Sequence, residues 1–213
     1  MTIRLLVKRL RLENREFITS DELKKYCSAT GVKYGAAVSY FIKRGYIVRI
    51  FRGIFYLKSL EELKLGRTKY NHFELVSKGM ELKKVRDWYF GLHSALKMNS
   101  MTHEHFTIEE VVNGTIFRLR PIKIAGYGFK FVKLSPSLLK FGILEKGDIR
   151  YSDPEKTILD FVYIWRYNGI PEERIISDVS DWAAGDISRS KLTRYAERYP
   201  ATVSAIVKRL VKK

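Results

Sequence analysis

The stretch FITSDELKKYCSATGVKYGAAVSYFIKRGYIVRIFRGIFYLK, residues 17–58, carries the strongest fold signals of this chain. Within it, Thr19 stands three residues before Glu22. This is the spacing of a capping box, in which each side chain accepts a hydrogen bond from the other residue's backbone N–H. The spacing predicts that a helix begins here. Gly31 predicts where it ends, because glycine readily adopts the left-handed backbone that stops a helix.

A further helix is predicted over 32–44, and its two faces differ in chemistry. One face, predicted to be buried, consists of Tyr34, Val38, Phe41, Ile42 and Gly45. The other, predicted to face DNA, consists of Lys33, Ala36, Ala37, Tyr40, Lys43 and Arg44. Small side chains permit close approach to a duplex, and cations neutralise its phosphates. An ordinary solvated helix would carry the same cations, so this face alone leaves both interpretations open.

The residues after this helix predict a β-hairpin. Two short β-prone runs, 46–50 and 54–57, flank a segment that contains Gly53. Glycine suits the tight turn of such a hairpin. The turn would place Arg49 and Arg52 at the hairpin tip, where they would add to the cations of the preceding helix.

The order of these elements is more specific than any one of them. Residues 3–13 repeat apolar side chains with helical spacing, which predicts a first helix. Three helices followed by a basic hairpin are the order of a winged helix-turn-helix, whose wing follows the phosphate backbone. The 213-residue chain has a net charge of +17, and residues 1–58 hold 13 Lys and Arg against 4 Asp and Glu. We therefore predict a domain over 1–60 that binds double-stranded DNA.

The rest of the chain predicts a mixed α+β domain over 85–213, joined to the first by a helical connector over 61–84. A helix is expected over 85–99. Strands are expected over 115–119, 121–125 and 129–134, and later helices over 172–183, 190–198 and 201–212. Asp153 and Pro154 predict another helix start, since aspartate caps helices and proline suits their first position. Strands in a block before helices indicate the α+β class.

Two groups of residues invite a catalytic or metal-binding interpretation, and neither fits. His103 and His105, with His93 nearby, lack a third ligand at a spacing familiar for zinc. The Asp-Pro-Glu-Lys run at 153–156 resembles part of a nuclease site, but a helix start alone favours acidic residues. No phosphate-binding loop or nucleophile motif occurs. We therefore expect no enzyme activity, no metal site and no cofactor.

Cysteine usage and hydropathy bear on the compartment. Cys27 is the one cysteine, so the chain can form no internal disulfide, which is typical of a reducing environment. No run of 18 apolar residues occurs that would suggest a membrane span. We expect a cytoplasmic protein that does not associate with membranes.

Three stretches resemble the AbiEi antitoxin family, the transcriptional regulators of type IV toxin-antitoxin pairs. The first is the hairpin region, where the matching residues are Arg44, Gly45, Ile47, Arg49, Gly53 and Tyr56. The others are GLHSALKMNSMT at 91–102 and YSDPEKTILDFVY at 151–163. The resemblance implies a protein that binds its own promoter and counteracts a nucleotidyltransferase toxin encoded beside it.

Two other functions stay open. The chain could be a stand-alone winged-helix regulator whose second domain binds a ligand or dimerises. It could also be a nucleic-acid-processing enzyme, such as a nuclease, that uses the winged helix for targeting. A neighbouring nucleotidyltransferase gene would favour the antitoxin, and metal-dependent cleavage of plasmid DNA would favour the enzyme.

Overall fold

The computed structural model describes residues 3–183, 185 and 187–212, and the chain forms two compact units. The first unit extends to Lys84 and includes Lys123–Tyr127. The second comprises Val85–Ile122 and the residues from Gly128 onward. Each unit combines helices with strands, so the predicted α+β class is confirmed. None of the helices within the described residues is long and apolar enough to cross a membrane.

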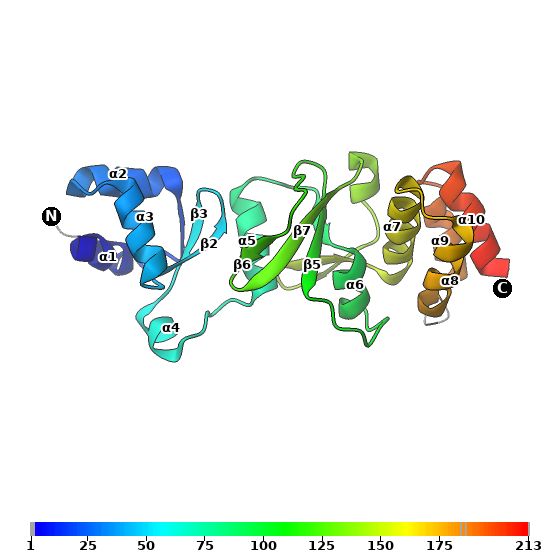
Figure 1. Cartoon of the computed structure of the whole chain (residues 1–213), viewed down its shortest axis with the longest axis horizontal. Coiled ribbons are helices and arrows are strands. Elements are labelled where there is room, and N and C mark those ends of the chain that lie inside the picture. The colour runs from blue at the N-terminus through cyan, green and yellow to red at the C-terminus, as the bar shows by residue number, and fades with distance from the viewer. Residues whose placement is uncertain (1–2, 184, 186, 213) are drawn as a thin grey trace. The chain divides into compact units, whose positions relative to one another are not determined.

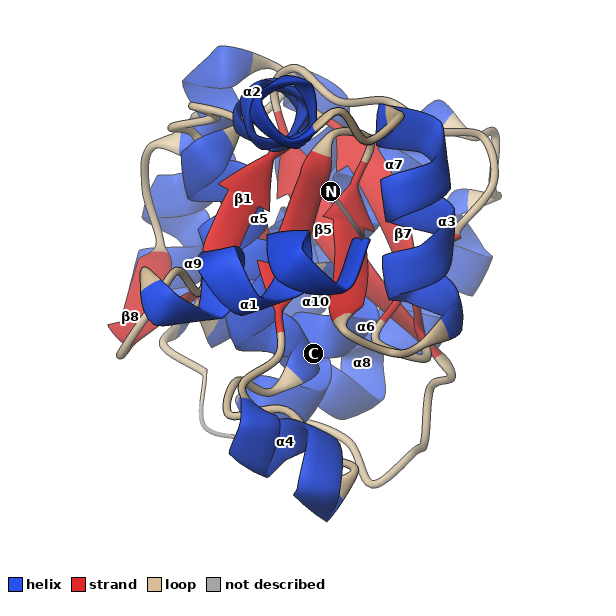
Figure 2. Cartoon of the chain, turned by 90° about the vertical axis from the view of Figure 1, so that its left-hand side faces the viewer, coloured by secondary structure: helices blue, strands red, loops and turns tan. Residues whose placement is uncertain are grey.

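The first unit packs helices around a small three-stranded sheet (Figure 1). Its helices are α1 (Ile3–Leu12), α2 (Ser20–Thr30), α3 (Tyr34–Lys43), α4 (Leu60–Leu65) and α5 (His72–Leu82). Its strands are β1 (Phe17–Thr19), β2 (Ile47–Phe51) and β3 (Ile54–Leu57), paired antiparallel in the order β1-β3-β2. In Figure 2, α2 and α1 are the blue ribbons above and below β1. Apolar residues of α1, α2, α3 and the strands form one core.

The predicted local signals act as expected in this unit. Thr19 and Glu22 form the capping box: Thr19 Oγ1 accepts from the Glu22 N–H, and Glu22 Oε2 accepts from the Thr19 N–H. Gly31 ends α2 with a φ of 68°, in the left-handed region. Gly53 has a φ of 78° in the turn between β2 and β3. A residue with a Cβ rarely adopts such angles, so the two glycines fix both boundaries.

Residues 61–84 do not form the separate connector that the sequence suggested. Instead, α5 packs on β2 in the first unit: a Cβ built on Gly79 would lie 2.6 Å from Ile50 Cγ2. The buried Glu62 of α4 accepts hydrogen bonds from the Tyr56 hydroxyl of β3 and from the backbone N–H of Lys69. Charged residues and two glycines made this segment look like a linker, whereas tertiary packing makes it part of the first unit.

The second unit carries most of a six-stranded mixed sheet. Its strands are β4 (Trp88–Phe90), β5 (Ile108–Asn113), β6 (Ile122–Ile124), β7 (Tyr127–Lys133), β8 (Ile143–Lys146) and β9 (Ile149–Ser152), in the order β6-β7-β5-β4-β9-β8. Strand β5 runs parallel to β7 with Glu110 opposite Lys130. Strand β4 is antiparallel to β5 and parallel to β9.

Helices cover part of this sheet and form a second layer beside it. They are α6 (Leu92–Met98), the 3-10 helix η1 (Pro136–Leu139), α7 (Pro154–Tyr167), α8 (Glu172–Ala183), α9 (Arg189–Ala196) and α10 (Ala201–Lys212). Helices α7 to α10 pack together around one apolar core, as the neighbouring ribbons in Figure 1 show. The predicted helix over 172–183 is confirmed, as is the one over 201–212.

Two predictions for the second unit are wrong. Residues 88–90 form strand β4 instead of the start of a helix, because three consecutive large side chains are all buried and the chain turns at Gly91. Residues 115–119 are not a strand. Asn113 Oδ1 accepts a hydrogen bond from the Thr115 N–H at 2.9 Å, and this side-chain turn ends β5.

The predicted helix start at Asp153 is confirmed, because Asp153 Oδ1 accepts a hydrogen bond from the Lys156 N–H at 2.8 Å and caps α7. Replacing Asp153 with alanine is expected to cost about 0.5 to 2 kcal/mol of stability, the usual size of a lost cap. Asp153→Asn retains an acceptor oxygen and should lose less. Urea denaturation, monitored by tryptophan fluorescence, measures the unfolding free energy of both variants. Equal losses in the two variants would show that the 3.1 Å ion pair of Asp153 Oδ2 with Lys191 Nζ, which both variants remove, outweighs the cap.

Candidate nucleic-acid interface

Most of the predicted DNA-facing residues of α3 lie at the surface. Lys33 precedes the helix as its N-cap residue, and Arg44 follows its last turn. These two residues, together with Ala36 and Lys43, are exposed. Tyr40 is half-buried and packs against the core of the first unit.

Ala37 does not lie on this surface, so the expectation that it faces DNA is wrong. Its side chain is fully buried, and it packs with Val38 and Phe41 in the core of the first unit. Ile42 deviates in the opposite direction: it was predicted to be buried but is 43% exposed. The helix is therefore rotated relative to the phase that its apolar residues suggested. The packing of α1 and α2 against α3 sets this rotation.

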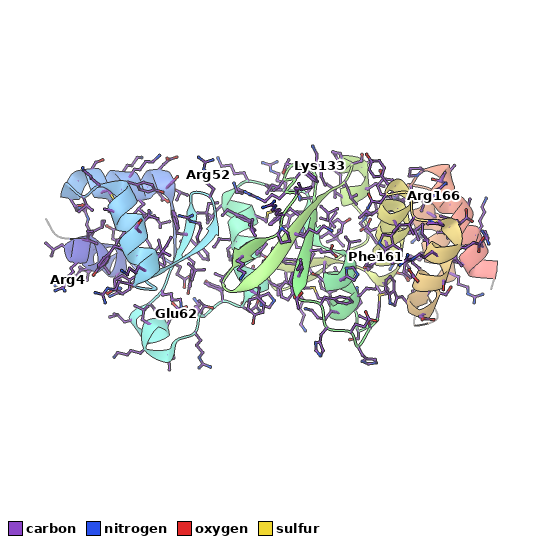
Figure 3. All side chains as sticks on the ribbon, viewed as in Figure 1. Arg4, Arg52, Glu62, Lys133, Phe161 and Arg166 are labelled. Carbon is purple, nitrogen blue, oxygen red and sulfur yellow. The ribbon has the colours of Figure 1, made fainter. Side chains whose placement is uncertain are left out.

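The hairpin presents its two arginines at different places. Arg52 is exposed in the two-residue turn between β2 and β3. Figure 3 labels it beside this turn. Arg49 lies within β2, opposite Phe55 of β3, and its guanidinium stacks 5.7 Å from the centre of the Phe55 ring. The prediction that both arginines sit at the tip is therefore wrong for Arg49, which is exposed along the strand.

The exposed cations of α3 and the hairpin differ from some other cations of the first unit, because those others form ion pairs. Elsewhere in the unit, Arg15 Nη1 lies 2.7 Å from Glu22 Oε1, and Lys69 Nζ lies 2.6 Å from Glu16 Oε1. In contrast, no carboxylate within the described residues pairs with any exposed cation of α3 or the hairpin. These cations are Lys33, Lys43, Arg44, Arg49 and Arg52. Their positive charge is not neutralised by the protein itself.

A series of cation–π and edge-to-face aromatic contacts extends this surface onto α1. The Arg44 guanidinium lies 5.8 Å from the Tyr40 ring centre, and the Tyr40 and Tyr46 ring centres are 6.0 Å apart. The Arg11 guanidinium in turn lies 4.9 Å from the Tyr46 ring centre. Cation–π contacts of this kind hold long cationic side chains in place. The end of α3 is thus connected to the basic face of α1.

This part of α1 was not among the residues predicted to face DNA. A groove of about 470 Å³ lies here, lined by Arg4, Val7, Lys8, Arg11, Leu12, Tyr46 and Leu60. No acidic residue is among its lining, and the buried Nη2 atom of Arg11 has no hydrogen-bond partner within the described residues. Arg4 is labelled on α1 in Figure 3. The available signal was the spacing of Arg4, Lys8 and Arg11 on one helical face.

The residues that invited a metal or nuclease interpretation have other surroundings. Within the described residues, no three His, Cys, Asp or Glu side chains are grouped to hold a metal ion. His93 Nδ1 lies 2.8 Å from Glu110 Oε2. In the 153–156 run, Glu155 pairs with Lys191, while the fully buried Lys156 pairs with Asp160. These contacts hold elements of the second unit together.

Comparison with known proteins bears on the fold alone. The sequence matches no protein-family model, and no curated protein matches it. The structure is similar to the crystal structure of the Rv2827c protein from Mycobacterium tuberculosis, with a TM-score of 0.58 and 12% sequence identity. The match covers 97% of this chain and 74% of that one. At this identity the likeness concerns architecture and assigns no activity.

Proposed function

We propose that the protein is a DNA-binding transcriptional regulator whose first unit is a winged helix-turn-helix. The order α1-β1-α2-α3-β2-β3 and the sheet order β1-β3-β2 support this proposal. In such a domain, α3 is the recognition helix in the major groove, and the β2–β3 hairpin is the wing. Lys33, Ala36 and Tyr40 then approach the base edges, while Lys43 and Arg44 bind phosphates.

The observation that carries the proposal is the set of unpaired cations on α3 and the hairpin. A protein surface normally pairs part of its cations with nearby carboxylates, as Arg15 and Lys69 do here. Cations left without such partners on adjoining elements raise the local potential and attract a polyanion. Duplex DNA gains most from such a surface, because each neutralised phosphate releases condensed counterions.

We further propose that the regulator acts as an antitoxin against a nucleotidyltransferase toxin. This part rests on the resemblance of 91–102 and 151–163 to AbiEi antitoxins. Both segments belong to the second unit, whereas the DNA-facing cations belong to the first. Repression and toxin neutralisation would then be separable by substitution.

The DNA-binding proposal is tested with the full chain and a duplex from the region upstream of its gene. Arg49→Ala/Arg52→Ala is expected to weaken binding to all sequences and to lower the slope of log K against log salt by about 1 per lost phosphate contact. The matched control, Arg15→Ala/Lys69→Ala, removes the same charge from paired positions of the same unit. It should leave the slope unchanged.

Unchanged gel-shift affinity of the hairpin variant at moderate salt would contradict the interface. An equal loss in both variants would show that net charge alone drives binding. The antitoxin proposal is tested separately, by co-expression with a neighbouring nucleotidyltransferase. The hairpin variant should still protect cells, and loss of protection in that variant would argue against separate functions.

A further inference from the structure

The second unit contains a groove that the proposed function does not use. Its volume is about 670 Å³, within the range of sites that hold small molecules. Most of its lining comes from helix α7 with Asn168 after it, from strand β7 with the residues after it, and from the segment 117–119. Leu92 and His93 of α6 and Glu110 of β5 complete it. Phe161 of α7 and Lys133 of β7, both on its lining, are labelled in Figure 3.

Six aromatic side chains are among the lining: Phe117, Phe131, Phe161, Tyr163, Trp165 and Tyr167. Phe131 and Phe161 are almost fully buried. Two others are largely exposed: Phe117 by 68% and Tyr167 by 82%. Leu119, also on the lining, is 84% exposed. Large apolar side chains gathered around one hollow and left in water are typical of a binding site. Aromatic rings in particular offer flat faces on which a planar ligand stacks.

The charges on the groove favour an anion. Arg118, Lys130 and Lys133 line it, against the single carboxylate of Glu110. That carboxylate already has partners, since its Oε1 lies 3.6 Å from Lys130 Nζ and its Oε2 lies 2.8 Å from His93 Nδ1. Arg118 and Lys133, by contrast, form no ion pair with any residue that the structure describes. Two cations are therefore available to a ligand.

We propose that this groove binds a nucleotide, with the base stacked on the aromatic side chains and the phosphate held by Arg118 and Lys133. Base–aromatic stacking combined with cations for the phosphate is the general chemistry of single-stranded nucleic-acid recognition. Ser135 and Asn168 on the lining offer hydrogen bonds to polar edges of the base. The bound nucleotide is either a free mononucleotide or one nucleotide of a single-stranded nucleic acid.

An acidic peptide fits the groove less well. Extended peptides commonly bind by adding a strand to an open sheet edge, and β7 is paired on both sides, with β5 and β6. A helical peptide needs a long apolar channel, whereas this hollow has the size of a single small ligand. A nucleotide fits better, because its base can stack on the aromatic rings while its phosphate contacts the unpaired cations.

The test is calorimetric titration of the full chain with four probes: adenosine monophosphate, inorganic phosphate, a ten-nucleotide single-stranded oligothymidine and an acidic copolymer of glutamate and tyrosine. We expect the mononucleotide or the oligonucleotide to bind and phosphate alone to bind far more weakly. Phe117→Ala/Tyr167→Ala and Arg118→Ala/Lys133→Ala should each weaken binding by about tenfold or more. The control Leu144→Ala/Lys146→Ala removes an exposed apolar residue and a cation outside the groove, and should bind normally.

Binding of the mononucleotide identifies a free nucleotide as the ligand, and binding of the oligonucleotide alone identifies a single strand. The inference is overturned if neither binds, if the groove variants bind like the control, or if only an acidic copolymer of glutamate and tyrosine binds. Nucleotide binding in this groove is independent of duplex recognition by the first unit. Arg49→Ala/Arg52→Ala should keep nucleotide binding, and the groove variants should keep binding to the promoter duplex.

Discussion

Replacing Asp160 with alanine is expected to destabilise the second unit by about 3–5 kcal/mol, the cost of leaving one partner of a buried ion pair alone. Asp160 and Lys156 of α7 are both completely buried, with Lys156 Nζ 3.1 Å from Asp160 Oδ1. The same Oδ1 accepts a hydrogen bond from the Tyr199 hydroxyl at 2.7 Å, and Oδ2 accepts one from the Tyr89 hydroxyl at 2.7 Å. The carboxylate thus joins α7 to β4 and to the segment before α10.

The electrostatics of this cluster explain why the loss is large. Burial lowers the pKa of the Lys156 ammonium, and the Asp160 carboxylate counteracts that effect. Burial, followed by the nearby Asp160 charge, raises the pKa of the Tyr89 and Tyr199 hydroxyls well above the usual value. Without Asp160, the Tyr89 and Tyr199 hydroxyls lose their acceptor, and the Lys156 amine loses its counter-ion and keeps a hydrogen bond to the Tyr199 hydroxyl at 3.0 Å. Each unsatisfied polar group adds its desolvation cost.

Urea denaturation of the full chain measures this effect, because all three tryptophans lie in the second unit and their fluorescence reports its unfolding. The control is Lys156→Met/Asp160→Leu, which removes both charges and leaves apolar side chains of similar size. It should recover a large part of the lost stability. A loss below about 1 kcal/mol in Asp160→Ala would contradict the role given to the cluster.

Replacing Gly79 with alanine is expected to cost about 1–3 kcal/mol, because the added methyl group overpacks the contact between α5 and β2. The new Cβ would lie 2.6 Å from Ile50 Cγ2 and 2.7 Å from Phe51 Cε2. Neither side chain can retreat easily, since both are buried. The strand that carries Arg49 and leads to Arg52 would have to shift.

Gly35 provides the matched control, because it is also helical and a Cβ built there meets nothing within 4 Å. Gly35→Ala should be neutral or should stabilise the protein by up to about 1 kcal/mol, since alanine loses less backbone entropy in a helix. Thermal unfolding followed by circular dichroism distinguishes the two variants. Similar unfolding temperatures for both would show that α5 does not pack tightly on the hairpin.

The prediction of helix ends and turns from sequence rested on local chemistry. The capping box of Thr19 and Glu22, the stop at Gly31 and the cap at Asp153 each depend on residues within a few positions of one another. Such contacts form in any tertiary context, so the sequence pattern was sufficient. The clustering of cations in the first 58 residues was equally visible, because it is a count and needs no geometry.

Assigning side chains to faces needed the tertiary structure. Ala37 was expected at the surface and is buried, whereas Ile42 was expected in the core and is exposed. The neighbouring helices set the rotation of α3, and the periodicity of its own sequence does not. The run at 88–90 resembled part of a helix because consecutive buried residues have no period, and only the pairing of β4 with β5 and β9 makes it a strand.

The sequence by itself determined the α+β class, the main helix boundaries and the basic character of the first unit. Only the tertiary structure decided that α5 belongs to that unit, that Arg11 connects α1 to the surface of α3 through Tyr46, and that residues from 92 to 168 enclose one groove. The physical reason is sequence separation. Caps and turns join residues close along the chain, whereas grooves and interfaces join residues that only packing brings together.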